Sequence, residues 1–296
     1  MAKRLLGLEV TAALKERLQT QTKDLKERGI LPKLTIIRVG ENPADLSYER
    51  GAVKCAAQIG VQVEHVILPT DVSKEELVEN IRRLNADPSV HGVLMFRPLP
   101  AHLKEYSTEI CNALMAAKDV DCMTDLSAAG VFEDRADLGF SPCTAGACLE
   151  ILDHYGINCE GKNVVVIGRS LVVGKPVAMM LLRRNATVTI CHRGTKNIAE
   201  IARNADILIT AAGALKSLTK EYVRPGQVVI DVSINWDENK LNRDGQRGAI
   251  AGDVVYEDVE PIVDAITPVP GGVGSVTVSI LMRQVIMAAR RLNAAR

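Results

Sequence analysis

The chain has 296 residues, of which 47% are hydrophobic, 24% are charged and only 3% are aromatic. This is the composition of a folded globular protein, and at about 150 residues per domain the length predicts two domains. Basic and acidic residues are equal in number, 36 of each, so the chain lacks the positive charge that attracts nucleic acid or an anionic membrane. We therefore expect a small-molecule site, with no nucleic-acid partner and no membrane.

The N-terminal sequence and the cysteine pattern both favour a cytoplasmic protein. The apolar stretch after Lys3 and Arg4 is broken at Glu9, unlike a secretory signal, and no uninterrupted apolar run approaches the roughly 18 residues of a membrane span. The seven cysteines contain no C-x-x-C pair, which is typical of reduced thiols. Because the five histidines lie far apart without ligand spacing, no metal site is expected.

The first part of the chain alternates between helical and strand-like periodicity. The expected elements are a helix over 9–28, a strand over 34–39, a helix ending near 59, a strand over 61–68, a helix over 74–84 and a strand over 92–96. This alternation predicts a parallel sheet with crossover helices. After it, the chain is irregular to about residue 142 apart from a helix near 109–116, so a domain junction is expected there.

The second part repeats the alternation, beginning with a helix at residue 143 for which Thr144 is a plausible N-cap. The elements expected after it are strands over 163–167, 187–191, 206–210 and 227–232, with a helix ending near 183, and a final amphipathic helix over 276–292. The chain is thus predicted to be an α/β protein of two domains. Residues 1–140 form the first domain, completed by the final helix (275–296), and residues 141–270 form a doubly wound, Rossmann-type domain.

A glycine-containing turn follows the first strand of the second domain. Gly168 and Gly174 bracket it in a G-x-S-x-x-x-G pattern, which differs from the usual G-x-G-x-x-G. Such a turn either binds a pyrophosphate at a helix N-terminus or merely packs a strand against a helix. The next strand ends at Arg193 rather than at an acidic residue, and with Arg169 this favours NADP, because two arginines can neutralise a 2′-phosphate. The alternative is that both arginines are solvated surface charges.

Several longer motifs occur in a fixed order. They are residues 39–44, which precede Tyr48, followed by Pro98-Leu-Pro100, Lys118-Asp-Val-Asp121, Val164–Ser170, Val173–Pro176, Ala186–Thr189, Asp231–Asn235, Gly252-Asp-Val254 and Ile266–Gly274. With these motifs the chain resembles the methylenetetrahydrofolate dehydrogenase/cyclohydrolase family over essentially its entire length.

The resemblance implies two α/β domains facing each other across a cleft, with a tetrahydrofolate one-carbon derivative on the first and NADP on the second. Tyr48 and Asp121 would line the folate site, Asp121 bonding the pterin, and Pro270, Gly271 and Gly272 would form a loop against the ligand. The positions implied for the dinucleotide are Gly168, Arg169, Ser170, Gly174, Arg193 and Ile234. The family commonly pairs its nucleotide domains, so a homodimer is also expected.

Two polar positions around the reacting carbon depart from the family pattern. The family has Tyr-x-x-x-Lys, but Ala52 stands at the lysine position, and Lys54 lies about 120° from Tyr48 on a helix. Arg97 replaces the usual glutamine. A smaller change is Ser275, where the family usually has proline.

These changes affect the family's two reactions unequally. Hydride transfer chiefly needs alignment, whereas opening the methenyl compound needs water and proton transfers. The leading hypothesis is an NADP-dependent methylenetetrahydrofolate dehydrogenase whose cyclohydrolase activity is weak or absent, with Tyr48, Arg97 and Asp121 as its catalytic residues. One alternative is a bifunctional enzyme in which Arg97 compensates, and another is a catalytically silent folate- or dinucleotide-binding regulator. An unrelated Rossmann dehydrogenase with a Tyr-x-x-x-Lys base is disfavoured by Ala52.

Overall fold

The computed structural model describes residues 1–241 and 247–294. The chain divides into two compact units. One combines Met1–Ala12 with Thr144–Thr277, and the other combines Ala13–Cys143 with the chain from Val278. We call them the six-stranded unit and the three-stranded unit after their main sheets.

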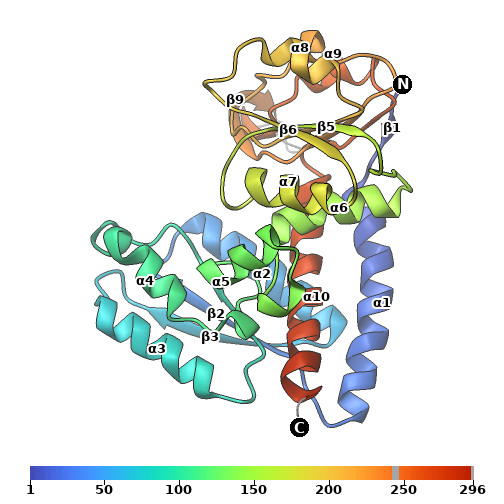
Figure 1. The fold of residues 1–296 in the computed structure, drawn as a ribbon. Helices are drawn as coiled ribbons and strands as arrows, with labels where there is room; N and C mark the ends of the chain where they lie inside the picture. The colour runs from blue at the N-terminus through green and yellow to red at the C-terminus, as the bar shows by residue number, and fades with distance from the viewer. Residues whose placement is uncertain (242–246, 295–296) are drawn as a thin grey trace. The chain divides into compact units, whose positions relative to one another are not determined.

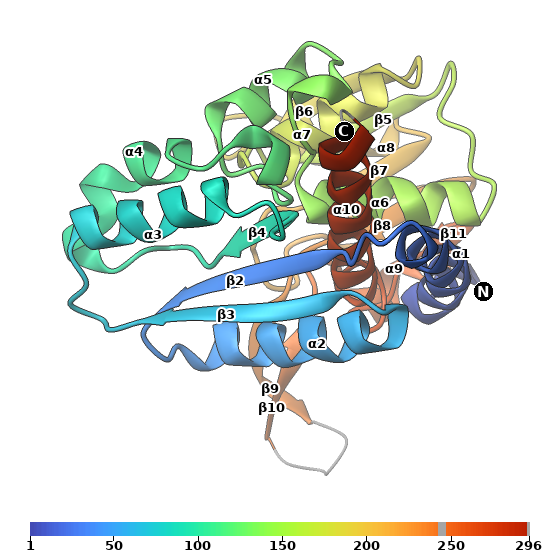
Figure 2. The ribbon, with the colours of Figure 1, turned by 90° about the horizontal axis from the view of Figure 1, so that it is seen from below.

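The three-stranded unit is built on a parallel sheet in the order β3-β2-β4. Its strands are β2 (Lys33–Val39), β3 (Gln62–Leu68) and β4 (Gly92–Met95). Figure 2 shows α2 (Pro43–Ile59) on one face of this sheet and α3 (Lys74–Ala86) on the other. The predicted β-α-β-α-β order is confirmed.

Local sequence explains where these helices begin and end. The side chain of Asn42 accepts a hydrogen bond from the N–H of Ala44, and α2 ends at Gly60, whose φ of 90° is left-handed. Ser73 caps α3 through the N–H of Glu76. Because these capping interactions are short-range, the local sequence fixes these helix ends without help from the rest of the fold.

Further short helices follow β4 in the segment for which a single helix was predicted. They are η1 (Ala101–Tyr106), α4 (Ser107–Asn112), η2 (Ala116–Lys118), α5 (Asp125–Phe132) and η3 (Ala136–Leu138). The predicted helix near 109–116 is thus two shorter ones, since the chain leaves α-helical geometry after Asn112.

The six-stranded unit has an all-parallel sheet in the order β1-β11-β8-β7-β5-β6. Its strands are β1 (Lys3–Arg4), β5 (Asn163–Ile167), β6 (Thr187–Cys191), β7 (Ile207–Thr210), β8 (Val228–Asp231) and β11 (Ala265–Ile266). Figure 1 shows α6 (Cys143–His154) and α7 (Gly174–Leu182) on one face, and α8 (Ile198–Arg203) and α9 (Tyr256–Val259) on the other. This is the doubly wound arrangement that the sequence predicts.

Two features of this unit differ from the sequence expectation. Residues 1–12 belong to it, although they were assigned to the first domain, because β1 pairs with β11. An antiparallel hairpin of β9 (Asn235–Leu241) and β10 (Arg247–Ala251) was not foreseen. β9 is largely polar, and neither strand has the apolar alternation of a typical strand.

Two long helices, α1 (Gly7–Glu27) and α10 (Val273–Ala294), contribute residues to both units. Among the described residues, α10 is the one helix with the length and composition to cross a membrane, but 67% of its qualifying stretch is buried inside the protein. The pattern suits a core helix.

Candidate functional site

The Lys118–Asp121 motif divides into a structural and a site-forming part. Lys118 is buried, and its ammonium donates to the carbonyls of Leu84, Asn85 and Asp87 at 2.6–2.9 Å, so it caps the C-terminal end of α3. The neighbouring Asp119 is also buried and accepts from the backbone of residues 123 and 124. The motif is therefore held rigidly on both sides of Val120.

Asp121 lies at the start of α6. Its carboxylate accepts a hydrogen bond from the Cys143 N–H at 3.1 Å, so it serves the first turn of the helix. The prediction that Thr144 is the N-cap is wrong, because the helix already begins at Cys143. Burial raises the pKa of Asp121, and the Cys143 hydrogen bonds and the Arg97 charge oppose that shift.

Tyr48 lies near this carboxylate. Its ring makes an edge contact with Phe96 at a centroid distance of 5.9 Å. Burial raises the pKa of the Tyr48 phenol well above its usual value, and the neighbouring Cys143 and Asp121 groups raise it further. The structure thus brings Tyr48 and Asp121 together, and it leaves the phenol protonated.

The start of α2 is fixed by a charged cluster beneath it. Glu49, next to Tyr48, pairs with the buried Arg38 at 3.1 Å and approaches His65 at 3.5 Å. Arg38 also donates to the carbonyl of Gly40. Because Arg38 lies on β2 and His65 on β3, the cluster ties the first half of α2 to the sheet.

Ala52 is fully buried, one helical turn beyond Tyr48, whereas Lys54 is exposed on another face of α2. The expected geometry of these positions is confirmed. No ammonium group therefore stands on the Tyr48 side of the helix at either position.

Arg97 follows β4 and is exposed. Its charge lowers the pKa of Asp121 against the larger effect of burial. Within the described ranges no ion pair of 4 Å or less joins Arg97 to an acidic group. The guanidinium therefore acts on Asp121 from beyond ion-pair distance.

The glycine turn after β5 is tightly packed. A Cβ at Gly168, where φ is 127°, would lie 2.4 Å from the carbonyl oxygen of Ala211, and one at Gly174 would lie 2.2 Å from that of Gly168. The Ser170 hydroxyl accepts from the N–H groups of Val173 and Gly174 at 3.1 and 3.4 Å. Only glycine fits at both bracketing positions, and Ser170 closes the turn onto α7.

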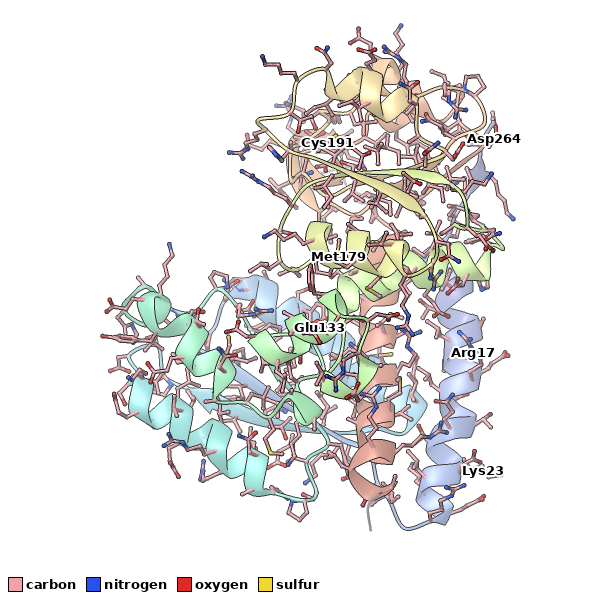
Figure 3. All side chains as sticks on the ribbon, in the orientation of Figure 1. Arg17, Lys23, Glu133, Met179, Cys191 and Asp264 are labelled. Carbon is pink, nitrogen blue, oxygen red and sulfur yellow. The ribbon has the colours of Figure 1, made fainter. Side chains whose placement is uncertain are left out.

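A cavity of about 510 Å³, which we call the larger cavity, opens beside this turn. It is lined by Ile167, Gly168, Arg169, Ser170, His192, Arg193, Ile198, Thr210, Ala211, Ala212, Ser217, Leu218 and Tyr222. Most of these residues lie at or just after the carboxyl ends of β5, β6 and β7; Cys191, labelled in Figure 3, ends β6. Since β6 and β7 lie on opposite sides of β5, the cavity sits where the strand order reverses, the usual ligand position in such sheets.

Two cations line this larger cavity. Arg169 and Arg193 are both exposed, and neither forms an ion pair with another described residue. Arginine stays charged at any working pH and binds phosphate through paired N–H groups. The chemistry of the cavity therefore suits a phosphorylated ligand.

A smaller cavity of about 180 Å³ lies in the same unit. It is lined by residues 231–234, Ile250 and residues 268–275, so it brings Ile234 together with Pro270, Gly271 and Gly272. Gly271 has a φ of 104°, and a Cβ at Gly272 would meet the carbonyl oxygen of Pro268 at 2.6 Å. The loop lets its backbone approach a ligand closely.

Two buried carboxylates beside these cavities received no role from sequence reasoning. Asp231 and Asp253 are 3% and 0% exposed. Burial raises the pKa of Asp231 to about 7. Both lie in motifs that the sequence singles out, but residue type alone did not show that the two side chains meet in space.

Within residues 1–241 and 247–294, no cluster of three or more His, Cys, Asp or Glu side chains is arranged to hold a metal ion.

Comparison with known proteins agrees with this arrangement. Residues 5–121 match the tetrahydrofolate dehydrogenase/cyclohydrolase catalytic domain, and residues 142–293 match the NAD(P)-binding domain of the same family. The bifunctional protein FolD of Carboxydothermus hydrogenoformans is 50% identical over 293 residues, covering 99% of each chain. FolD of Alkaliphilus oremlandii is 45% identical over 290 residues, covering 98% of each chain.

Solved structures give the same match. The FolD methylenetetrahydrofolate dehydrogenase/cyclohydrolase of Campylobacter jejuni has 36% identity and a TM-score of 0.90, with 98% of this chain and 99% of that one covered. The Trypanosoma brucei FolD, solved with NADP and an inhibitor, has 33% identity and a TM-score of 0.90, with 100% and 99% covered.

Proposed function

Because the chain belongs to the tetrahydrofolate dehydrogenase/cyclohydrolase family, we propose that it oxidises 5,10-methylenetetrahydrofolate to 5,10-methenyltetrahydrofolate with NADP, and that its cyclohydrolase activity is weak or absent. The observation that carries this proposal is the fully buried Ala52 beside Tyr48 and Asp121. A methyl group can neither donate nor accept a proton.

The folate derivative is proposed to bind the three-stranded unit. Asp121 bonds the pterin, since its carboxylate is positioned by the first turn of α6. Tyr48 forms the wall next to the reacting carbon, held there by Phe96 and by the cluster beneath α2. Arg97 orients water or holds an anion but cannot act as a base. Pro270, Gly271 and Gly272 form a loop of the six-stranded unit whose backbone can approach a ligand closely.

NADP is proposed to bind the larger cavity of the six-stranded unit, in keeping with the matched NAD(P)-binding domain. When bound, it accepts the hydride that leaves the methylene carbon. Gly168, Ser170 and Gly174 form the turn against the pyrophosphate, and Arg169 and Arg193 neutralise the 2′-phosphate. Ile234, from the smaller cavity, is proposed to contact the dinucleotide as well.

The two activities differ in what they need from side chains. Hydride transfer depends on holding the carbon and the acceptor in alignment. Hydrolysis of the methenyl compound depends on proton transfer, where a positioned acid or base contributes about 10² to 10⁴-fold, roughly 3–5 kcal/mol. Alanine at position 52 is therefore expected to slow hydrolysis far more than oxidation.

The test is to follow NADPH formation and methenyltetrahydrofolate consumption separately with one purified preparation, in a buffer with low background hydrolysis. We expect steady NADPH formation while methenyltetrahydrofolate accumulates, because its hydrolysis runs at close to the uncatalysed rate. Robust hydrolysis abolished by Arg97→Ala would instead establish a bifunctional enzyme in which Arg97 compensates. Binding of both ligands without NADPH formation would indicate a silent regulator.

The protein is also proposed to be a cytoplasmic homodimer. All seven cysteines are free thiols, which suits a reducing compartment. Trp236 on β9 pairs with Ile250 on β10, and these side chains are 64% and 38% exposed. Paired residues of antiparallel strands share a face, so the hairpin presents an apolar patch that a second copy would cover.

A further inference from the structure

Asp253 is the centre of a buried hydrogen-bond cluster in the six-stranded unit. Its Oδ2 accepts from the Thr210 hydroxyl, the Ala212 N–H and the Ser233 hydroxyl at 2.7–2.8 Å. Its Oδ1 accepts from the Ala214 N–H at 2.8 Å and the Asn235 amide at 3.1 Å. Five hydrogen bonds thus converge on one fully buried carboxylate.

The donors come from the walls of two different cavities. Thr210, the last residue of β7, and Ala212, just after it, line the larger cavity. Ser233 lines the smaller cavity, in the segment that follows β8. A further bond from the Gly213 N–H to the Ser233 hydroxyl, at 3.1 Å, joins the two segments directly.

Asp231 holds Asp253 in place from the other side. Its carboxylate accepts from the N–H groups of Ser233, Asp253 and Val254 at 2.9–3.2 Å. A Cβ at Gly252 would lie 1.9 Å from the Asp231 carboxylate, so the residue before Asp253 must be glycine. The backbone around Asp253 is thus clamped by hydrogen bonds and by close packing.

From this arrangement we infer that Asp253 is a positioning residue that holds the walls of both cavities in register for the cofactor. The inference rests on the proposed NADP site. Asp253 itself lines neither cavity and takes no part in hydride transfer. It acts by bonding the backbone N–H groups of Ala212 and Ala214 together with the side chains of Thr210, Ser233 and Asn235.

The test is Asp253→Asn, with NADP binding measured by calorimetry or by fluorescence in the absence of folate. Asparagine keeps one acceptor oxygen but turns N–H groups toward donors. We expect NADP affinity to fall by about tenfold or more, and kcat to fall with it. The KM for methylenetetrahydrofolate should change less than about twofold, because the proposed folate contacts Tyr48 and Asp121 lie in the other unit and Asp253 bonds none of residues 270–272.

Asp206→Asn is the matched control. Asp206 accepts from the Asn163 N–H at 2.9 Å, just before β5 and β7 begin, at the opposite end of the same sheet. The Asp206→Asn variant should bind NADP with the affinity of the unmodified protein. If the Asp253→Asn variant folds normally and has the NADP affinity and kcat of the unmodified protein, the inference is overturned.

If Asp253→Asn does not fold, Thr210→Val and Ser233→Ala each remove one hydroxyl donor to Asp253 and decide the matter. Both should weaken NADP binding while the folded fraction, measured by circular dichroism, stays unchanged; unchanged binding in both would refute the inference. NADP binding is measured without turnover, so the result stands even where the unmodified protein proves not to oxidise methylenetetrahydrofolate. Lack of that oxidation contradicts the proposed function alone.

Discussion

At the scale of single residues, the proposed loss of hydrolysis depends on positions 48 and 52. Ala52→Lys should raise hydrolysis of methenyltetrahydrofolate, by up to about 10²-fold, because an ammonium would again stand one turn from Tyr48. Ala52 is fully buried, so the longer side chain must extend toward the phenol. Initial rates of methenyltetrahydrofolate loss measure the effect.

Lys54→Ala is the control, since Lys54 lies on another, exposed face of α2. It should leave both activities unchanged. The full gain is expected in Ala52→Lys combined with Arg97→Gln, because Arg97 would repel a new ammonium nearby. No gain in either variant would show that the loss of hydrolysis does not depend on this position.

The proposed preference for NADP likewise depends on two residues. Replacing Arg169 and Arg193 together by alanine should raise the KM for NADP by about 10²-fold or more, because each of the two removed charge-assisted contacts contributes about 1.5–3 kcal/mol. The KM for NAD, which has no 2′-phosphate, should change far less. Steady-state kinetics with both cofactors measure the difference, and Lys196→Ala, outside the larger cavity, is the control. Equal changes for both cofactors would contradict the assignment.

A third residue-scale effect concerns stability and pH. Burial raises the pKa of Asp231 from 3.8 to about 7, so the folded protein holds this proton more tightly than the unfolded chain. The free energy of unfolding should therefore fall as pH rises from about 4 to about 7, by on the order of 4 kcal/mol from this group. Above that range the contribution stays constant.

Urea denaturation across this pH range measures the effect. Asp231→Asn carries no titrating proton, so its unfolding free energy should depend less on pH than that of the unmodified protein. Asp206→Asn serves again as the control and should keep the full pH dependence. If the unfolding free energy of Asp231→Asn depends on pH as steeply as that of the unmodified protein, other groups cause the pH dependence.

At the scale of secondary-structure elements, one buried ammonium ends a helix. Lys118→Met keeps the aliphatic stem but removes the three hydrogen bonds to the carbonyls that end α3. The free energy of unfolding should fall by about 2–4 kcal/mol, because buried carbonyl groups lose their partners. Urea denaturation measures it, with the exposed Lys104→Met as control. Equal stability of the two variants would contradict the capping role.

The elements also show where sequence reasoning succeeds. The strand over 163–167 and the strand over 187–191 have the predicted bounds, because their β-branched residues stand between clear turn signals. The hairpin of β9 and β10 escaped prediction, since its residues lack apolar alternation. The N-cap of α6 also escaped it, because the carboxylate that serves the first turn belongs to Asp121, 22 residues away.

At the scale of the whole molecule, self-association should depend on the apolar patch of the β9–β10 hairpin. Trp236→Glu places a charge on the exposed face, and burying it in an interface without a partner would be costly. Sedimentation at micromolar concentration should change from dimer to monomer, with the exposed Glu238→Gln as control. A monomeric unmodified protein would contradict the proposed homodimer.

The sequence by itself determined the α/β class, the order of most helices and strands, the family, and the substitution of Ala52 and Arg97. These follow from short-range patterns and from residue identity, which need no spatial information. The membership of Met1–Ala12 in the six-stranded unit needed the structure, because a two-residue strand acquires its place only by pairing with β11.

Only the tertiary structure brought Asp231 and Asp253 into contact with the segments that line the two cavities. It also showed that Arg97 does not pair directly with a described carboxylate, and that Lys118 is a helix cap. The physical reason is the same in each case. Hydrogen bonds and buried charges join residues tens of positions apart, and their partners are chosen by how the strands are ordered and packed rather than by local spacing.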